Sequence, residues 1–268
     1  MINVLDKQEI VSSVQSEWAG CNVFFFEETG STNVEAKMLA EQGAVHGTLV
    51  VADSQSGGKG RRGRSWHSPK GSAIAMSLIL KPELELDKAS MLTIVQAMAV
   101  AKALEEICGC KPHIKWPNDI LINEKKVCGI LTEMNLEKSE IASIIIGCGV
   151  NVNQESFPKE ISHIATSLKI ETGQMFNRAE LIGHICRYFE EYFGKFMSVK
   201  DLSGMVAEYN NYLISQGRNV KVLDPKGEFQ GEALGINAQG ELLVKKVSGE
   251  IVNVYAGEVS VRGIYGYV

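Results

Sequence analysis

The sequence contains no long hydrophobic run and no recognisable signal peptide. Its N-terminus, MINVLDKQEI, lacks the basic start and continuous apolar core of a secretory signal, and no later apolar run approaches the roughly 18 residues of a membrane span. We therefore expect a cytoplasmic protein with no membrane partner.

Residue patterns that mark metal sites and hydrolases are also missing. The six cysteines are scattered without a C-x-x-C pair, and the five histidines show neither H-E-x-x-H nor close metal-ligand spacing. A G-x-S-x-G motif and a Walker A motif are absent as well. The sequence therefore predicts reduced, buried thiols and no metal site of its own, and any nucleotide must be held by an architecture other than the P-loop.

An excess of positive charge is lacking too. The formal net charge is -5 and the sequence pI is about 5.7, whereas non-specific affinity for nucleic acid comes from many Lys and Arg facing the phosphates. Residues 3–18 are too few for a winged helix-turn-helix domain, so we expect no specific DNA binding. With 45% hydrophobic residues, the chain is long enough for one large domain or for a large and a small one.

Against this acidic background, residues 58–66 (GKGRRGRSW) form a local basic cluster, with four cations and three glycines in its first seven positions. Glycine lets backbone amides approach an anion, and guanidinium forks bind phosphate or carboxylate oxygens in pairs. Trp66 adds a flat apolar face. The segment therefore predicts a nucleotide-binding loop, and a basic arm on a nucleic-acid backbone is the alternative interpretation.

Hydrophobic patterning predicts two domains, residues 1–217 and 218–268. In the first, apolar runs predict strands at residues 21–26, 47–52, 72–80, 114–116, 120–122, 127–134 and 141–146. Helical spacing predicts helices at residues 3–18, 34–42, 88–108, 178–197 and 202–215, with Asp87 and Asn177 as N-caps. In the second, a small barrel of about five strands is predicted at residues 219–223, 228–236, 241–247, 250–255 and 259–262.

Four polar segments carry side chains suited to ligand binding, and each has a plainer interpretation. Residues 31–33 (STN) can bind a ligand at a helix start or simply cap the helix. Residues 115–119 (KWPND) can aim polar groups around a rigid proline or end a strand with a solvated Asp. Lys126 in residues 126–129 (KVCG) can serve a site or face solvent. Residues 147–153 (GCGVNVN) can present two asparagines or form a glycine bulge.

Taken together, in this order and at this spacing, these segments resemble the biotin protein ligases, which act as biotin-[acetyl-CoA-carboxylase] ligases. The resemblance covers nearly the whole chain and includes Gln55. It implies an α+β fold, with a central mixed β-sheet flanked by helices like that of class II aminoacyl-tRNA synthetases, and a small C-terminal SH3-like β-barrel. Two departures are Lys59, where the family commonly has Arg, and the lack of the N-terminal DNA-binding domain found in bifunctional repressor members.

The resemblance implies a reaction in which biotin and ATP give biotinyl-5'-AMP, and biotin then passes to one lysine of a biotin carboxyl carrier protein. Mg2+ accompanies the ATP. Lys126 and Arg61 are the implied catalytic cations, and Lys126 acts electrostatically. The implied biotin-binding residues are Ser31, Thr32, Asn33, Gln55, Gly58, Lys59, Gly60, Arg61, Lys126 and Gly129. The implied ATP-binding and adenylate-binding residues are Arg61, Arg64, Trp66, Asn118, Asp119, Lys126, Asn151 and Arg262.

Several points stay open at this level. Asp119 can contribute to the ATP site or help to deprotonate the carrier lysine. The basic loop, residues 58–66, is expected to be mobile when empty and ordered over the adenylate, where it excludes water. A homodimer through the edge of the central sheet is expected by analogy. The competing functions are a lipoate or octanoyl carrier-protein ligase and, from another class, a nucleic-acid-binding regulator.

Overall fold

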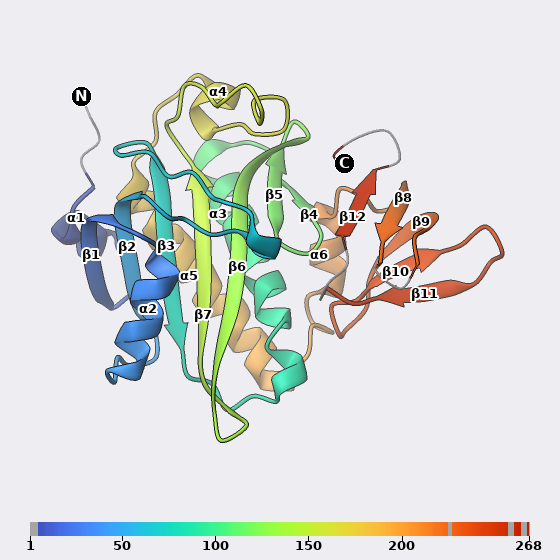
Figure 1. Ribbon diagram of the computed structural model, residues 1–268, viewed down its shortest axis with the longest axis horizontal. Coiled ribbons are helices and arrows are strands. Elements are labelled where there is room, and N and C mark those ends of the chain that lie inside the picture. The colour runs from blue at the N-terminus through green and yellow to red at the C-terminus, as the bar shows by residue number, and fades with distance from the viewer. Residues whose placement is uncertain (1–4, 225–226, 257–259, 264–266, 268) are drawn as a thin grey trace.

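The computed structural model describes residues 5–224, 227–256, 260–263 and 267. A seven-stranded sheet forms its larger part (Figure 1). Its strands are β1 (Asn22–Thr29), β2 (Thr48–Gln55), β3 (Ala73–Leu80), β4 (His113–Lys115), β5 (Asp119–Ile122), β6 (Lys125–Glu137) and β7 (Glu140–Asn151). They lie in the order β1-β2-β3-β7-β6-β5-β4. The β1–β2 pair is parallel and the other pairs are antiparallel, so the predicted mixed sheet is confirmed.

Helices cover both faces of this sheet (Figure 1). They are α1 (Lys7–Ser13), α2 (Thr32–Glu41), α3 (Met91–Cys108), α4 (Leu168–Thr172), α5 (Arg178–Val199) and α6 (Val206–Tyr212). Alternate residues of a strand point to opposite faces. Ile144 and Ile146 of β7 accordingly join the main core with α3 and α5, whereas Ile145 packs with Ala36 and Ala40 of α2. Burial on both faces explains why the central strands read as continuous apolar runs.

Helix boundaries differ from the predicted ones where local hydrogen bonds decide them. Asp87 does not cap α3; it lies in the short 3-10 turn η2 (Leu86–Lys88), and α3 begins only at Met91. Residues 3–4 of the helix predicted at residues 3–18 lie outside the described residues, and the described part of that prediction contains α1 alone. The helix predicted at residues 202–215 is shortened to α6. Asn177 does cap α5, because its side chain accepts from the Glu180 amide. No helix in the described ranges is long and apolar enough to cross a membrane.

The glycine-rich segment after residue 146 continues β7 without a bulge. Gly147 pairs with Ser77 of β3 and with Leu131 of β6, and Gly149 pairs with Ala75 and Gly129 in the same register. The glycine-bulge interpretation of residues 147–153 therefore does not hold, because regular ladders on both sides keep the chain extended as far as Asn151.

A second sheet of five antiparallel strands follows α6. Its strands are β8 (Asn219–Leu223), β9 (Phe229–Ile236), β10 (Leu242–Lys245), β11 (Ile251–Val254) and β12 (Ser260–Gly263), in the order β11-β10-β9-β8-β12. Within the described residues β11 does not pair with β12, so the expected barrel is an open sheet there. Residue 259, the predicted start of the last strand, lies outside the described residues. The boundary at residue 217 stays our prediction.

Candidate active site

A chain of polar side chains lies at the start of α2, on the face of the sheet opposite α3. Ser31 occupies the N-cap position, but its side chain makes no capping hydrogen bond, so the simple helix-cap interpretation does not describe it. The Thr32 amide donates to Gln55 Oε1 at 2.8 Å. Ser77 Oγ of β3 lies 2.8 Å from Thr32 Oγ1 and 2.6 Å from Asn33 Oδ1. These buried contacts fix polar groups in one orientation at the floor of a pocket.

Gly147 makes room for this arrangement. A Cβ atom at Gly147 would overlap the side-chain amide of Asn33. The Asn33 amide nitrogen donates to Glu133 Oε2 of β6 at 2.6 Å. Glycine at this position of β7 is thus required for Asn33 to lie flat against the sheet.

The basic loop connects β2 to β3 and folds back on itself. The Gly60 amide donates to Arg64 O at 2.7 Å, and the Trp66 amide donates to Gly58 O at 2.8 Å. Between them lies the short turn η1 (Arg61–Gly63), in which Arg62 has a left-handed backbone with φ 60°. A Cβ atom at Gly58 would overlap Trp66 O and crowd Gln55 Nε2, so the close packing of the loop against these residues requires glycine at this position.

Trp66 lies on a glycine floor formed by two strands. Gly129 of β6 and Gly149 of β7 are paired directly, and a Cβ atom on either would contact the indole ring. The indole Nε1 is buried and has no hydrogen-bond partner within the described part of the chain. Lys126 Nζ lies 5.4 Å from the ring centroid. The indole therefore occupies the space between the loop and the sheet.

Lys126 and Asp119 form the centre of a charged cluster on the β5–β6 hairpin. The two-residue turn of this hairpin, Asn123–Glu124, has positive φ at both positions, as a tight hairpin requires. Lys126 Nζ lies 2.6 Å from Asp119 Oδ1. The backbone of Lys126 is held as well, because its amide donates to Ile164 O and its carbonyl accepts from the Thr166 amide.

Groups from three other segments complete the cluster. Tyr267 donates its hydroxyl to Asp119 Oδ2 at 2.6 Å, and the Lys115 ammonium lies 3.2 Å from the centroid of the Tyr267 ring. Arg61 Nη1 donates to Asn118 Oδ1 at 2.9 Å, and Arg61 Nη2 donates to Ala256 O. Strands, basic loop and C-terminal domain thus meet at one point.

Burial and charge shift the pKa values of these groups. Burial alone would raise the pKa of Asp119, but the Lys126 ammonium and the hydrogen bonds from Lys126 and Tyr267 outweigh it, so the pKa lies below its ordinary value. Burial lowers the pKa of Lys115 to about 8, against the opposing attraction of Asp119. Burial also lowers the pKa of Arg61. The cluster therefore holds an ionised carboxylate among cations, and one of those cations, Lys115, has a pKa of about 8.

Two cavities adjoin at this cluster and bring most of the predicted residues together. The first, about 50 Å³, is lined among others by Ser31, Thr32, Asn33, Gln55, Lys59, Gly60, Arg61, Trp66, Asn118, Lys126 and Gly129. The second, about 110 Å³, is lined among others by Gly60, Arg61, Arg64, Trp66, Asn118, Asp119, Lys126 and Arg262. Lys126, Arg61 and Asn118 border both, so a ligand reaching from one cavity to the other passes beside all three.

Asn151 lines neither cavity, so its assignment to the nucleotide site stays a prediction. It lies on the same face of β7 as Gly149, but the segment after β7 covers it. Its amide nitrogen donates to Thr166 O at 3.0 Å, and its Oδ1 accepts from Gln154 Nε2. In this structure Asn151 therefore connects β7 to the following loop.

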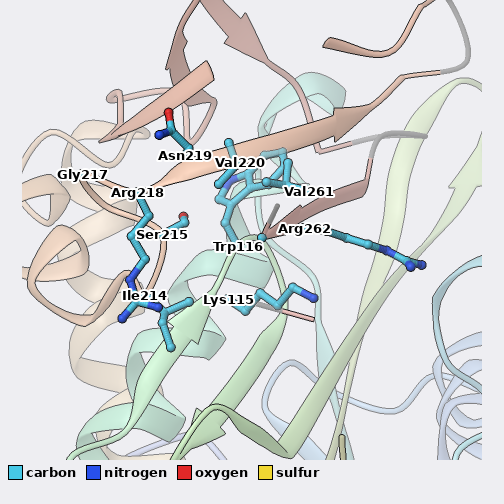
Figure 2. A pocket seen from close by; sticks show the side chains of 11 residues that line it. Lys115, Trp116, Ile214, Ser215, Gly217, Arg218, Asn219, Val220, Val261 and Arg262 are labelled. Carbon is cyan, nitrogen blue, oxygen red and sulfur yellow. The ribbon is translucent and has the colours of Figure 1, made fainter. Parts of the chain in front are cut away.

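A larger cavity of about 460 Å³ lies between the seven-stranded and the five-stranded sheet (Figure 2). Lys115 and Arg262 border it, but their side chains extend to one side, and both also line the second cavity described above. Arg218 points to the other side. The cations of this cavity therefore diverge instead of meeting around a common ligand.

Four residues around the site were not assigned from the sequence. Ser77 could have been found, because it is the one hydroxyl in the otherwise apolar strand β3. Lys115 belongs to the KWPND segment but had no assigned role. No local sequence pattern pointed to Glu133. Tyr267 could not have been found from local pattern, because its contact with Asp119 joins residues 148 positions apart.

Known proteins and protein families are similar to this chain. The Biotin/lipoate A/B protein ligase family matches residues 25–151, and the Biotin protein ligase C terminal domain matches residues 216–262. The Bifunctional ligase/repressor BirA of Bacillus subtilis is 40% identical over 95% of this chain and 78% of its own length. The biotin-[acetyl-CoA-carboxylase] ligase of Paracoccus denitrificans is 32% identical over 88% of this chain and 98% of its own length.

Solved structures agree. The biotin protein ligase from Aquifex aeolicus in complex with biotin and ATP superimposes with a TM-score of 0.79 and 33% identity, covering 90% of this chain and 99% of that one. Its likeness spans both the sheet that carries the two cavities and the C-terminal domain. The chain therefore belongs to the biotin protein ligase family.

Proposed function

We propose that this protein activates biotin with ATP to biotinyl-5'-AMP and transfers biotin to a lysine of a biotin carboxyl carrier protein of the acetyl-CoA carboxylase type. The observation that carries this proposal is the position of Lys126 between the two adjoining cavities. Biotin belongs in the cavity at the start of α2, and the nucleotide phosphates belong in the cavity beside Asp119. The carboxylate of biotin and the α-phosphate of ATP then meet at Lys126.

The polar chain at the start of α2 suits the ring system of biotin. Thr32, Asn33 and Gln55 present hydroxyl and amide groups that are fixed by Ser77 and by one another. Fixed donors and acceptors discriminate strongly between ligands with and without matching polar atoms, since a mismatched ligand leaves them unpaired. We propose this chain as the source of specificity for biotin.

Activation joins two anions, and the cations around Lys126 lower its barrier. A carboxylate oxygen of biotin attacks the α-phosphorus, a new O–P bond forms, and the bond from the α-phosphorus to the bridging oxygen breaks to release pyrophosphate. Lys126 lies beside both anions and offsets the negative charge that accumulates between them. Arg61 borders the same two cavities and adds a second positive charge.

Substrate entry requires the basic loop to move. A cavity of about 50 Å³ holds only a few water molecules, since each needs about 10–15 Å³. The Trp66 indole fills the adjoining space over Gly129 and Gly149. We propose that the loop and Trp66 withdraw to admit the ligands and then close over the adenylate, which protects the mixed anhydride from water.

Mg2+ enters this proposal as part of the ATP substrate, with its charge shared by the phosphates. Asp119 lines the second cavity, where we place the nucleotide phosphates and which we call the phosphate-side cavity. Both oxygens of Asp119 already face donors, Lys126 and Tyr267. The residues at this cavity thus fit a metal carried by the nucleotide better than a resident one.

Transfer to the carrier needs a lysine amine to attack the activated carbonyl, so that AMP leaves and the amine loses a proton. Asp119 is a weak proton acceptor, because its pKa is held low by its two donors. This favours an electrostatic role for Asp119 over that of general base.

We further propose a cytoplasmic protein that makes no specific complex with DNA, and a homodimer that uses an edge strand of the seven-stranded sheet, β1 or β4.

The central test incubates the protein with biotin, ATP, Mg2+ and a biotin carboxyl carrier domain and measures the intact mass of that domain. We expect the mass of the carrier to rise by one biotinyl group. Lipoate and octanoate in place of biotin test the competing acyl-ligase function, and labelling with either acid but not with biotin would overturn the proposal.

The role of Lys126 is tested in the same reaction mixture by Lys126→Ala, with pyrophosphate release as the measurement. We expect biotin-dependent pyrophosphate release to fall by at least 100-fold with an unchanged melting temperature, because preorganised charge of this kind is worth roughly 10²–10³ in rate. Lys125→Ala is the matched control, since Lys125 lines neither cavity. Near-normal adenylation by Lys126→Ala would refute the assignment.

A further inference from the structure

Tyr267 reaches the phosphate-side cavity from the segment that follows β12. Its hydroxyl donates to Asp119 Oδ2 at 2.6 Å, and its ring lies under the Lys115 ammonium, 3.2 Å from the ring centroid. Asp119 and Lys115 pair with each other across the β4–β5 ladder. One tyrosine thus contacts both charged residues of a strand pair at the edge of the cavity.

We propose that Tyr267 is a positioning residue for adenylation: its hydroxyl orients Asp119, and its ring holds the Lys115 ammonium toward the phosphates. This inference rests on the proposed function. The two halves of the side chain act on different partners, because a phenol offers a hydrogen-bond donor at its tip and an electron-rich face along its ring. They can therefore be separated by mutation.

The hydroxyl acts on Lys126 through Asp119. Asp119 holds Lys126 with one oxygen and Tyr267 with the other. Without the phenol donor, Oδ2 loses its hydrogen bond inside a buried site, and the carboxylate becomes easier to protonate. A protonated Asp119 no longer anchors Lys126 between the two cavities.

The other charged and titratable groups that act on Asp119 come from several elements. Lys126 and Cys128 lie on β6 and Lys115 on β4, while Arg61 comes from the basic loop. The cations favour the ionised carboxylate, and they remain when the Tyr267 hydroxyl is removed. Loss of the hydroxyl is therefore expected to raise the pKa of Asp119, but less than burial would raise it if the cations were absent as well.

Biotin-dependent exchange of pyrophosphate into ATP, measured over a range of pH with full-length protein, separates the two contacts. For Tyr267→Phe we expect the acid limb of kcat/KM to move up by roughly one pH unit, with little change in KM for ATP near neutral pH. For Tyr267→Ala we expect the same shift and, in addition, a KM for ATP raised about 5-fold, because the cation–π contact to Lys115 is lost.

Tyr255→Phe is the matched control. Tyr255 lies in the same C-terminal part of the chain, and its hydroxyl is 3.3 Å from Ser90 Oγ. The pH profile of Tyr255→Phe is expected to match that of the unmodified protein. An acid limb unchanged in Tyr267→Phe, or a KM for ATP unchanged in Tyr267→Ala, would overturn the inference. Failure of the proposed function is distinguishable, since the unmodified protein would then show no exchange with biotin. A variant with lower activity at every pH and the same profile indicates a structural role and also refutes the proposal.

Discussion

At the scale of single residues, the site is a set of cations whose charges are tuned by burial. Lys115 shows this most clearly. Its ordinary pKa of 10.5 falls to about 8 because burial disfavours the ammonium, although Asp119 opposes the change. Lys115 is therefore charged at pH 7 and largely neutral above pH 9, so that its attraction for phosphate depends on pH.

We predict that kcat/KM for ATP falls as pH rises through about 8 in the unmodified protein, because the neutral amine no longer attracts the phosphates. Lys115→Arg should remove this basic limb, since a guanidinium stays charged over the whole range. The measurement is biotin-dependent pyrophosphate exchange from pH 6 to about pH 9.5.

The lowered pKa of Lys115 affects the stability of the fold in the direction opposite to its effect on activity. Between pH 8 and 10.5 the unfolded chain binds more protons at Lys115 than the folded chain does, so this group makes folding more favourable as pH rises. A melting temperature that falls in step with activity would therefore contradict the titration of Lys115 as the cause.

Sequence pattern found most of the residues at the site but not their partners. Lys126, Arg61 and Asn118 follow from motif order, and the structure brings them to the border of both cavities. Asn151 lines neither cavity, so its assignment to the nucleotide site stays a prediction; the strand pattern places it on the correct face but cannot reveal that its side-chain amide contacts Thr166 and Gln154. Tyr267 depends on how the whole chain folds back, which no local pattern encodes.

At the scale of elements, the pairing of β6 with β7 shapes the floor of the site. Gly129 and Gly149 lie directly opposite each other, and together they make a strip without side chains on which the Trp66 ring rests. Because the neighbouring ladders hold both glycines in extended strands, alanine can adopt the same backbone, and its methyl group acts mainly by displacing the ring.

We predict that Gly149→Ala raises the KM values for biotin and ATP about 10-fold or more while changing the melting temperature little, because the added methyl overlaps the indole and disturbs loop closure. Gly194→Ala is the matched control. Gly194 lies in α5 with no atom near the position of an added Cβ, so this change should leave activity intact and stabilise the helix by roughly 0.5–1 kcal/mol. Equal kinetics for the two variants would contradict the proposed role of the glycine floor.

Element boundaries were harder to predict than element types. The central strands were found because burial on both faces gives them long apolar runs, and α5 was found from its amphipathic spacing and the Asn177 cap. The start of α3 was misplaced, because Asp87 is a favourable cap by residue type but lies in a separate 3-10 turn. Local residue preference cannot decide between two adjacent turns when packing selects one of them.

At the scale of the whole molecule, the basic loop is tied to both domains through Arg61. This side chain donates to Asn118, which immediately precedes β5, and to Ala256 O of the C-terminal domain. The tether closes the loop over the phosphate-side cavity. The same long-range dependence explains why the described residues of the second sheet form an open sheet where a barrel was predicted, since strand order depends on contacts that periodicity does not specify.

We predict that Arg61→Gly still forms the adenylate but releases it before transfer, because the loop loses its contacts with both domains. Free biotinyl-5'-AMP should accumulate, and bystander proteins should be labelled, as measured by mass spectrometry of the reaction mixture. Arg62→Gly is the control: Arg62 is exposed and has a left-handed backbone that glycine adopts readily, so its labelling should stay confined to the carrier. Carrier-only labelling by Arg61→Gly would refute the tether.

The position of Trp66 also makes the protein its own optical probe. Of the three tryptophans, Trp116 is buried at the domain junction, where its Nε1 donates to Gly240 O, whereas Trp66 alone rests on the glycine floor beneath the basic loop. Any withdrawal of the loop exposes this indole to water, together with its Nε1, which has no hydrogen-bond partner among the described residues. The contribution of Trp66 to the tryptophan emission is therefore expected to shift to longer wavelength when the loop opens, and its loss in Trp66→Phe identifies that contribution without any attached dye.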